Sequence, residues 1–200
     1  MSEMATNSQS RSSSIWGWLP WVVYFVLGGF GYRTIGAFVA LVAAAYPVVM
    51  ARTHRTSMKL PELAALAFFV LAAGIPLLGG AIAISFWKYN FVVMWIIFAG
   101  GAWGSILLGT PFTTMYARES TPREFWKTDI FRRTNLILTS VWASLFTLNL
   151  LATSAVVGAT GLEAWIPLIV PTITVVGAFV FTSRYTASVQ RATSSMGAPA

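Results

Sequence analysis

Residues 15–50 read IWGWLPWVVYFVLGGFGYRTIGAFVALVAAAYPVVM, an apolar stretch that contains one charged residue, Arg33. A helix needs about 17–25 apolar residues to cross a hydrocarbon core about 30 Å thick. If the whole stretch formed one helix, Arg33 would lie near mid-membrane, where a charge is strongly unfavourable. The glycine-rich residues 28–31 favour a tight turn just before the arginine. We therefore predict two membrane-spanning helices, at 15–32 and 34–50.

The composition of the whole chain extends this prediction. Of its 200 residues, 56% are hydrophobic and 10% are charged, whereas about a quarter of the residues in a soluble domain are charged. Four further apolar stretches are long enough to cross a membrane, at 61–84, 91–108, 136–157 and 165–182. We predict an all-α integral membrane protein, a bundle of six transmembrane helices formed by residues 15–185. Residues 1–14 are predicted to be a disordered cytoplasmic tail, and residues 186–200 a flexible cytoplasmic tail.

The distribution of basic residues predicts the orientation of these helices. Six spans place Arg33 and Lys88 on one side of the membrane and the other eleven of the 13 basic residues on the opposite side. Basic residues accumulate in cytoplasmic loops, so we expect both termini in the cytoplasm and the connections at Arg33, 85–90 and 158–164 outside. The eleven predicted cytoplasmic residues are Arg11, Arg52, Arg55, Lys59, Arg118, Arg123, Lys127, Arg132, Arg133, Arg184 and Arg191.

Several classes of function are disfavoured by what the chain lacks. The middles of the predicted helices contain no ionisable residue, whereas pumps, voltage sensors and most ion-coupled carriers need such groups at membrane depth. There is no cysteine, and the only histidine is His54, so thiolate or histidine metal sites and cysteine nucleophiles find no support. We expect no enzymatic activity and no cofactor or metal. The net charge of +7 is attributed to membrane orientation, and no nucleic-acid partner is expected.

Two features of the predicted helices indicate close packing. Gly100 and Gly104 form a GxxxG pair, a surface that admits a neighbouring backbone from this chain or from a partner. Asn149 lies near the middle of the polar helix 136–157 and needs a hydrogen-bond partner there. Its polar neighbours either line a path for a solute or bond to other helices, and helix–helix bonding is the favoured interpretation.

The stretch 109–134 is the longest polar connection. Thr121-Pro122-Arg123-Glu124 has the form of a capping box and predicts a short helix that begins at Pro122, between the fourth and fifth spans. Aromatic and basic residues suit such a helix to the membrane surface, in contact with anionic lipid headgroups or with a partner protein. The residues predicted to make these contacts are Arg118, Arg123, Trp126, Lys127, Arg132 and Arg133.

Part of the chain resembles a known family. Gly109-Thr110-Pro111-Phe112, a basic segment, then Phe131-Arg132-Arg133-Thr134-Asn135 and Trp142-Ala143-Ser144-Leu145-Phe146 resemble the second half of the intracellular septation protein A family. These are small bacterial inner-membrane proteins with several spans and no established catalytic residue. The resemblance implies a bacterial inner membrane and a role in the cell envelope through contacts with other membrane proteins.

Three functions remain open at this point. The favoured one is a non-catalytic scaffold or accessory subunit of a larger membrane complex, because it accounts for the missing ionisable groups and the small-residue surface. Its partners are membrane lipids, through anionic headgroups on the cytoplasmic side, and other membrane proteins. The alternatives are a channel or carrier for a small neutral solute, with 136–157 lining the path, and a membrane enzyme or cofactor subunit.

Overall fold

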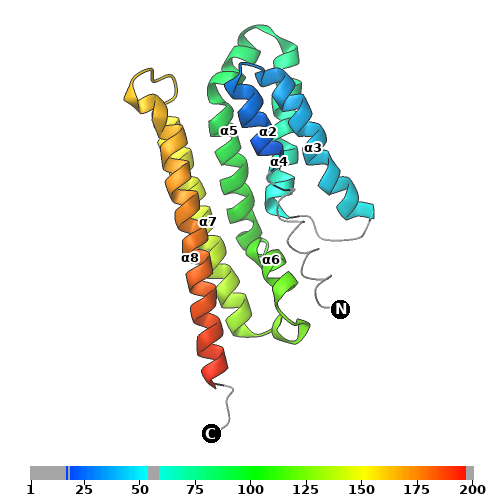
Figure 1. Ribbon diagram of the computed structural model, residues 1–200, viewed down its shortest axis with the longest axis vertical. Helices are drawn as coiled ribbons and strands as arrows, with labels where there is room; N and C mark the ends of the chain where they lie inside the picture. Colours follow the sequence, from blue (N-terminus) through cyan, green and yellow to red (C-terminus); the bar gives the residue numbers. More distant parts are fainter. Residues whose placement is uncertain (1–16, 18, 54–58, 197–200) are drawn as a thin grey trace. The chain divides into compact units, whose positions relative to one another are not determined.

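The computed structural model describes residue 17 and residues 19–53 and 59–196 (Figure 1). All regular elements in these residues are helical. The predicted tail 1–14, the predicted cytoplasmic residues Arg11 and Arg55, and the single histidine, His54, lie outside the described part. The elements in chain order are α2 (Leu19–Gly29), α3 (Arg33–Thr53), α4 (Leu60–Gly74), η1 (Ile75–Leu78), α5 (Gly80–Leu107), α6 (Thr113–Ser120), η2 (Arg123–Phe125), α7 (Asp129–Ala155), η3 (Leu162–Trp165) and α8 (Ile166–Met196).

Five of these segments are long and apolar enough to cross a membrane. They are α3, α4 continued by η1, α5, α7 and α8. The chain is therefore an all-α protein with the helices of a multi-pass membrane protein. The first predicted span, 15–32, corresponds to α2, which has 11 described residues. At about 1.5 Å per residue this segment is about 16 Å long, too short to cross alone.

The predicted turn before Arg33 is confirmed, and its hydrogen bonds show why α2 ends there. Gly31 adopts a positive φ of 87°, a conformation that glycine enters without strain. Tyr32 N donates to Leu27 O (2.9 Å), and Gly31 N donates to Gly28 O (3.1 Å). These two bonds form a Schellman motif, which satisfies the last carbonyls of α2. The next helix then begins at Arg33.

The predicted boundary between the third and fourth spans is wrong. In place of a connection at 85–90, the chain turns at Gly79 and Gly80, whose φ angles are 67° and 56°. Pro76 lacks an N–H group, so the end of α4 tightens into the 3₁₀ turn η1 before these glycines. Residues 85–90 lie inside α5, and Lys88 is therefore a charged residue within an apolar helix.

The helices fall into two compact units, Met1–Gly101 and Ala102–Ala200. In the first unit, α3 packs against α2 and α4. An aromatic cluster lies in this unit: the Trp21 ring is 5.3 Å from that of Phe68 and 5.0 Å from that of Phe69, and both phenylalanines are fully buried. Small side chains let α3 approach closely, since Ala37 and Ala40 are also fully buried. Close apolar packing therefore holds the first unit together.

In the second unit, α7 packs against α6 and α8. The expected capped helix from Pro122 is not observed. Thr121 is extended, as is common before proline, and residues Arg123–Phe125 form a 3₁₀ turn without a side-chain cap. Thr128 caps α7 instead, because its hydroxyl oxygen accepts a hydrogen bond from Phe131 N (3.3 Å). The short helix between the fourth and fifth spans is α6, which precedes the predicted position.

Both long helices of the second unit are longer than the apolar patterns at 136–157 and 165–182. α7 begins at Asp129, and α8 continues to Met196, through residues predicted to be a flexible tail. Hydroxyl groups near the end of α8 bond to backbone carbonyls one turn earlier, as Thr193 Oγ1 does to Val189 O (2.9 Å). Polar residues can continue a helix beyond its apolar part, because backbone hydrogen bonds do not depend on side-chain hydropathy.

Candidate functional site

The polar side of α7 that faces α8 is hydrogen-bonded to that helix. Asn149 is fully buried, and its Nδ2 donates to Thr174 Oγ1 (2.9 Å), while the Thr174 hydroxyl donates to Asn149 Oδ1 (3.1 Å). Nearer the start of α7, Trp142 Nε1 donates to Thr182 Oγ1 (3.1 Å). Hydrocarbon offers no water as an alternative partner, so such bonds hold neighbouring helices in register. Asn149 thus joins α7 to α8 in this structure.

Other polar residues of α7 bond to α5 and α6 within the same unit. Trp103 Nε1 donates to Thr147 Oγ1 (3.1 Å), and the Thr147 hydroxyl donates to Ala143 O (2.9 Å). The Thr113 hydroxyl donates to Asn135 O (2.9 Å) and therefore accepts from the Thr139 hydroxyl, also at 2.9 Å. Two buried side-chain atoms of α7 have no hydrogen-bond partner among the residues that the structure describes, Asn135 Oδ1 and Thr153 Oγ1. These bonds place threonine hydroxyl groups between helices.

The basic connection brings three of its six predicted contact residues together. The guanidinium carbons of Arg118 and Arg123 lie 5.0 Å and 5.7 Å from the ring centroid of Trp126. Trp126 Nε1 donates to Thr121 O (2.9 Å), which holds the ring in the connection. Cation–π contacts of this kind are worth about 0.5–1 kcal/mol at exposed sites. The stacked cluster therefore presents two cations at the surface.

The other three predicted contact residues lie outside this cluster. Lys127 follows Trp126 directly, whereas Arg132 and Arg133 lie in the first turns of α7. All three are exposed. The connection thus carries five exposed cations, and the aromatic ring among them is held by stacking and by a local hydrogen bond.

The glycines of α5 differ in what surrounds them. A Cβ atom added to Gly100 or to Gly104 would meet no atom of the described residues within 4 Å. A Cβ on Gly101 would lie 2.5 Å from Leu60 Cδ1, so the close approach inside the first unit occurs at that glycine. Gly100 and Gly104 therefore share an open face of α5, whereas Gly101 lies on a packed one.

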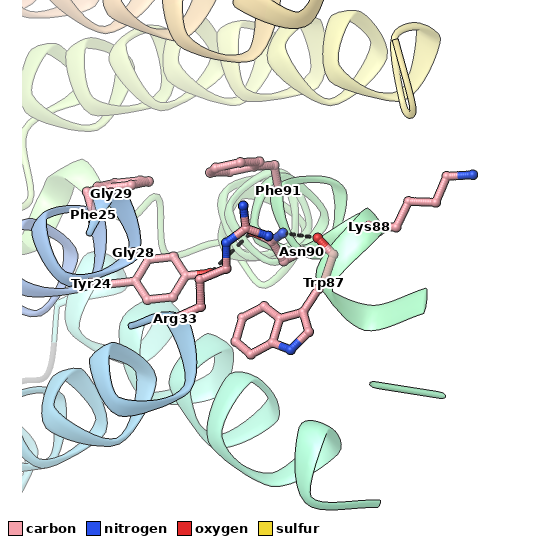
Figure 2. Close-up of a pocket in the computed structure, with 9 residues that line it drawn as sticks. All are labelled: Tyr24, Phe25, Gly28, Gly29, Arg33, Trp87, Lys88, Asn90 and Phe91. Carbon is pink, nitrogen blue, oxygen red and sulfur yellow. Dashed lines mark hydrogen bonds between the residues drawn. The ribbon is translucent and has the colours of Figure 1, made fainter. Parts of the chain in front are cut away.

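A cavity of about 350 Å³ lies in the first unit, beside the turn that joins α2 and α3. Tyr24 and Arg33 line it from these helices, and Asn90 lines it from α5. The Tyr24 hydroxyl donates to Asn90 Oδ1 (3.3 Å), and Asn90 Nδ2 donates to Trp87 O. Figure 2 shows the Arg33 side chain beside Tyr24 and Asn90, whereas the Lys88 side chain extends away from them. A fixed amide and a guanidinium therefore share one cavity.

The sequence patterns do not predict this cavity. The sequence does distinguish Arg33 and Lys88 in one respect: they are the two basic residues outside the predicted cytoplasmic set. The prediction placed both residues in connections, and it assigned no role to Asn90. The structure places Lys88 and Asn90 on one helix instead, so that α5 meets the α2–α3 turn at these positions.

Metal-ligating residues do not gather in the part of the chain that the structure describes: it contains no group of three histidine, aspartate or glutamate side chains. No family model, curated protein or solved structure matches the chain. The resemblance of 109–146 to the septation protein A family therefore stays a prediction.

Proposed function

We propose that this protein is a non-catalytic, multi-pass membrane protein that acts as a scaffold or accessory subunit of a larger membrane complex. The hydrogen bonds of α7 carry the proposal. Asn149 and Thr147, which lie near the middle of the apolar stretch 136–157, bond to Thr174 and Trp103 of neighbouring helices. A solute path along α7 needs polar groups that face a lumen. Side chains used for helix–helix bonds fit a structural role better.

The outer surfaces of the helices support the same proposal. In the part of the chain that the structure describes, 6% of the residues in the apolar part of α8 are buried, against 39% in that of α7. The Gly100/Gly104 face of α5 also has open space above it. Small residues at a helix surface let another helix approach closely in a membrane, where association depends on packing. We infer that the partner is a helical membrane protein that packs against this face.

The remaining parts of the proposal concern location. The expected site is a bacterial cytoplasmic membrane, with both termini in the cytoplasm. The exposed cations of the basic connection, such as Arg132 and Arg133, support contact with anionic headgroups on the cytoplasmic side. A cell-envelope role follows if the septation protein A resemblance reflects a shared function.

Substitutions on α5 test the scaffold proposal. Gly100→Leu and Gly104→Leu add bulk to the open face, and overpacking costs about 1–3 kcal/mol where a partner packs closely. The tagged protein is purified in mild detergent, and co-purifying membrane proteins are quantified by mass spectrometry. We expect both variants to lose a stoichiometric partner while circular dichroism shows unchanged helix content. Gly74→Leu is the matched control, because this exposed helical glycine also has open space around it.

Asn149→Leu separates the scaffold from the solute channel. In the scaffold, the variant loses bonds that average about 0.6 kcal/mol in membranes, so the partner should stay bound. If the protein is a channel, Asn149→Leu should stop the flux of solute, whereas Gly100→Leu and Gly104→Leu should have smaller effects. If Asn149→Leu abolishes function with every partner bound, or if Gly100→Leu leaves the set of co-purifying proteins unchanged, the scaffold proposal is wrong.

A further inference from the structure

We propose that the cavity between the α2–α3 turn and α5 binds the phosphate group of a phospholipid, with Arg33 as its main ligand. The cavity of about 350 Å³ has room for a headgroup phosphate and its glycerol. Its lining combines the Arg33 guanidinium and the Asn90 amide with the aromatic rings of Phe25 and Phe91. Such a mixture of cationic, polar and apolar groups matches an amphiphile with a charged headgroup.

The charge balance of the first unit indicates an anion. Arg33 is exposed, and the only carboxylate among the described residues of this unit is Glu62. Glu62 accepts a hydrogen bond from Lys59 N (3.1 Å) at the start of α4, at the opposite end of this unit from the α2–α3 turn (Figure 1). The described part of the first unit therefore provides no counterion for Arg33. Guanidinium groups bind phosphate with paired hydrogen bonds.

The position of Arg33 in its helix also favours an anion. Arg33 is the first residue of α3, and the first turn of this helix contains no acidic residue. The start of a helix carries partial positive charge and free N–H groups, so a cation there is disfavoured and an anion is favoured. A bound phosphate would interact favourably with both the guanidinium and the helix terminus. The arginine at this position is thus explained by a ligand rather than by helix stability.

The space beside Arg33 depends on two glycines of α2. A Cβ atom on Gly28 would lie 3.9 Å from Arg33 Cγ, and one on Gly29 would meet no described atom within 4 Å. Both glycines line the cavity. A Cβ on Gly28 would approach Arg33, so a larger side chain at Gly28 would fill part of the cavity without removing a charge.

Aromatic residues around the turn favour a lipid as the source of the phosphate. Phe30 is 76% exposed, Tyr32 58% and Tyr89 45%. Exposed aromatic rings are typical of the headgroup region of a membrane. The Phe25 and Phe91 rings are stacked at 6.1 Å and form an apolar wall, against which a glycerol backbone and the start of an acyl chain can pack.

Lipid retention by the full chain tests this proposal. The delipidated protein in detergent is incubated with phosphatidylglycerol, and the bound lipid is counted by native mass spectrometry. A hydrogen bond to a charged group changes affinity about tenfold, so we expect Arg33→Gln to bind the most tightly bound lipid about tenfold more weakly. Arg52→Gln removes the same charge from the other end of α3 and should bind lipid as the unmodified protein does.

Gly28→Leu is a second variant that leaves every charge in place. Leucine has a higher helix propensity than glycine, so a loss of bound lipid in this variant would reflect the filled cavity. Circular dichroism checks that the helix content is unchanged. Unchanged affinity for the most tightly bound phosphatidylglycerol in both Arg33→Gln and Gly28→Leu would overturn the proposal, and so would an equal loss for Arg52→Gln.

Two further ligands test whether the cavity recognises the phosphate, the acyl chains or both. Diacylglycerol lacks the phosphate and should bind much more weakly, and equal binding would overturn the proposal. Glycerol 3-phosphate has the phosphate without acyl chains and should not displace the lipid. If it binds in an Arg33-dependent way while phosphatidylglycerol does not bind, the phosphate site is upheld and its source is a soluble phosphate ester. None of these measurements depends on a protein partner, so the result is independent of the scaffold proposal.

Discussion

Single polar residues have well-defined structural roles in this protein. Thr128 provides the cap of α7, and Asn149 joins α7 to α8. Unpaired polar groups are costly in hydrocarbon, so a buried amide or hydroxyl has to find a donor or acceptor. The exchange of bonds between Asn149 and Thr174 satisfies both side chains at once. Polar residues can therefore stabilise the helix pair without forming a site for chemistry.

The cap of α7 leads to a prediction for one residue. Thr128→Ala removes the oxygen that accepts from Phe131 N, and the loss of an N-cap costs about 0.5–2 kcal/mol. We expect faster hydrogen exchange at the start of α7, around Phe131, measured by mass spectrometry in detergent. Thr121→Ala is the control, because the segment after Thr121 has no side-chain cap. If Thr121→Ala speeds exchange over 123–129 and Thr128→Ala leaves α7 unaffected, the cap is at Thr121, as the capping-box pattern predicts, and not at Thr128.

Glycine and proline decide where the helices of the first unit begin and end. Gly31 ends α2 through a Schellman motif, and the pair Gly79–Gly80 separates η1 from α5. Both turns need backbone angles that other residues adopt with strain. The glycines at 28–31 and the charge of Arg33 together predicted the first turn, whereas the hydropathy pattern missed the second, where the flanking residues are apolar. Turn residues are thus a better guide than polarity to the ends of these helices.

Substitution of Gly31 tests this role of the turn. Gly31→Ala forces a side chain into a backbone conformation with φ of 87°, which costs about 1–2 kcal/mol. We expect a decrease of that size in the free energy of unfolding, measured by titration with dodecyl sulfate. Gly29→Ala, at a helical position with open space, should leave stability unchanged or raise it. Equal effects of the two substitutions would mean that the positive φ is not required.

At the scale of the whole molecule, the five long apolar helices and the short α2 leave one question of topology. An odd number of crossings would place the two termini on opposite sides, whereas six crossings place both on one side. The excess of arginine and lysine in the predicted cytoplasmic connections favours six.

Labelling of single cysteines tests the topology, since the chain has no cysteine of its own. We expect Leu78→Cys and Glu163→Cys to react with a membrane-impermeant reagent from outside the cell, and Ser120→Cys to react only from the cytoplasm. Ser13→Cys decides between five and six crossings, and we expect it to be cytoplasmic. Labelling of Ser13→Cys from outside would mean that α2 does not cross, and labelling of Ser120→Cys from outside would reverse the orientation.

The class of the protein follows from the sequence by itself. Hydropathy and length predict apolar helices because burial in lipid and helix length are properties of a local stretch. The turn at Gly31 is equally local, since glycine and the adjacent Arg33 both act within a few residues. The need of Asn149 for a partner follows from its chemistry and its place in an apolar stretch.

Only the tertiary structure decided which residues meet. Nothing in the sequence around Asn149 distinguishes Thr174 from other hydroxyl groups as its partner, and the choice depends on how α8 packs on α7. The cap at Thr128 prevailed over the capping box at Thr121, because Trp126 bonds back to Thr121 and closes the intervening turn. The cavity at Arg33 requires α5 to run past the α2–α3 turn as one helix. Contacts between distant segments depend on packing in three dimensions, which hydropathy and local backbone preference do not determine.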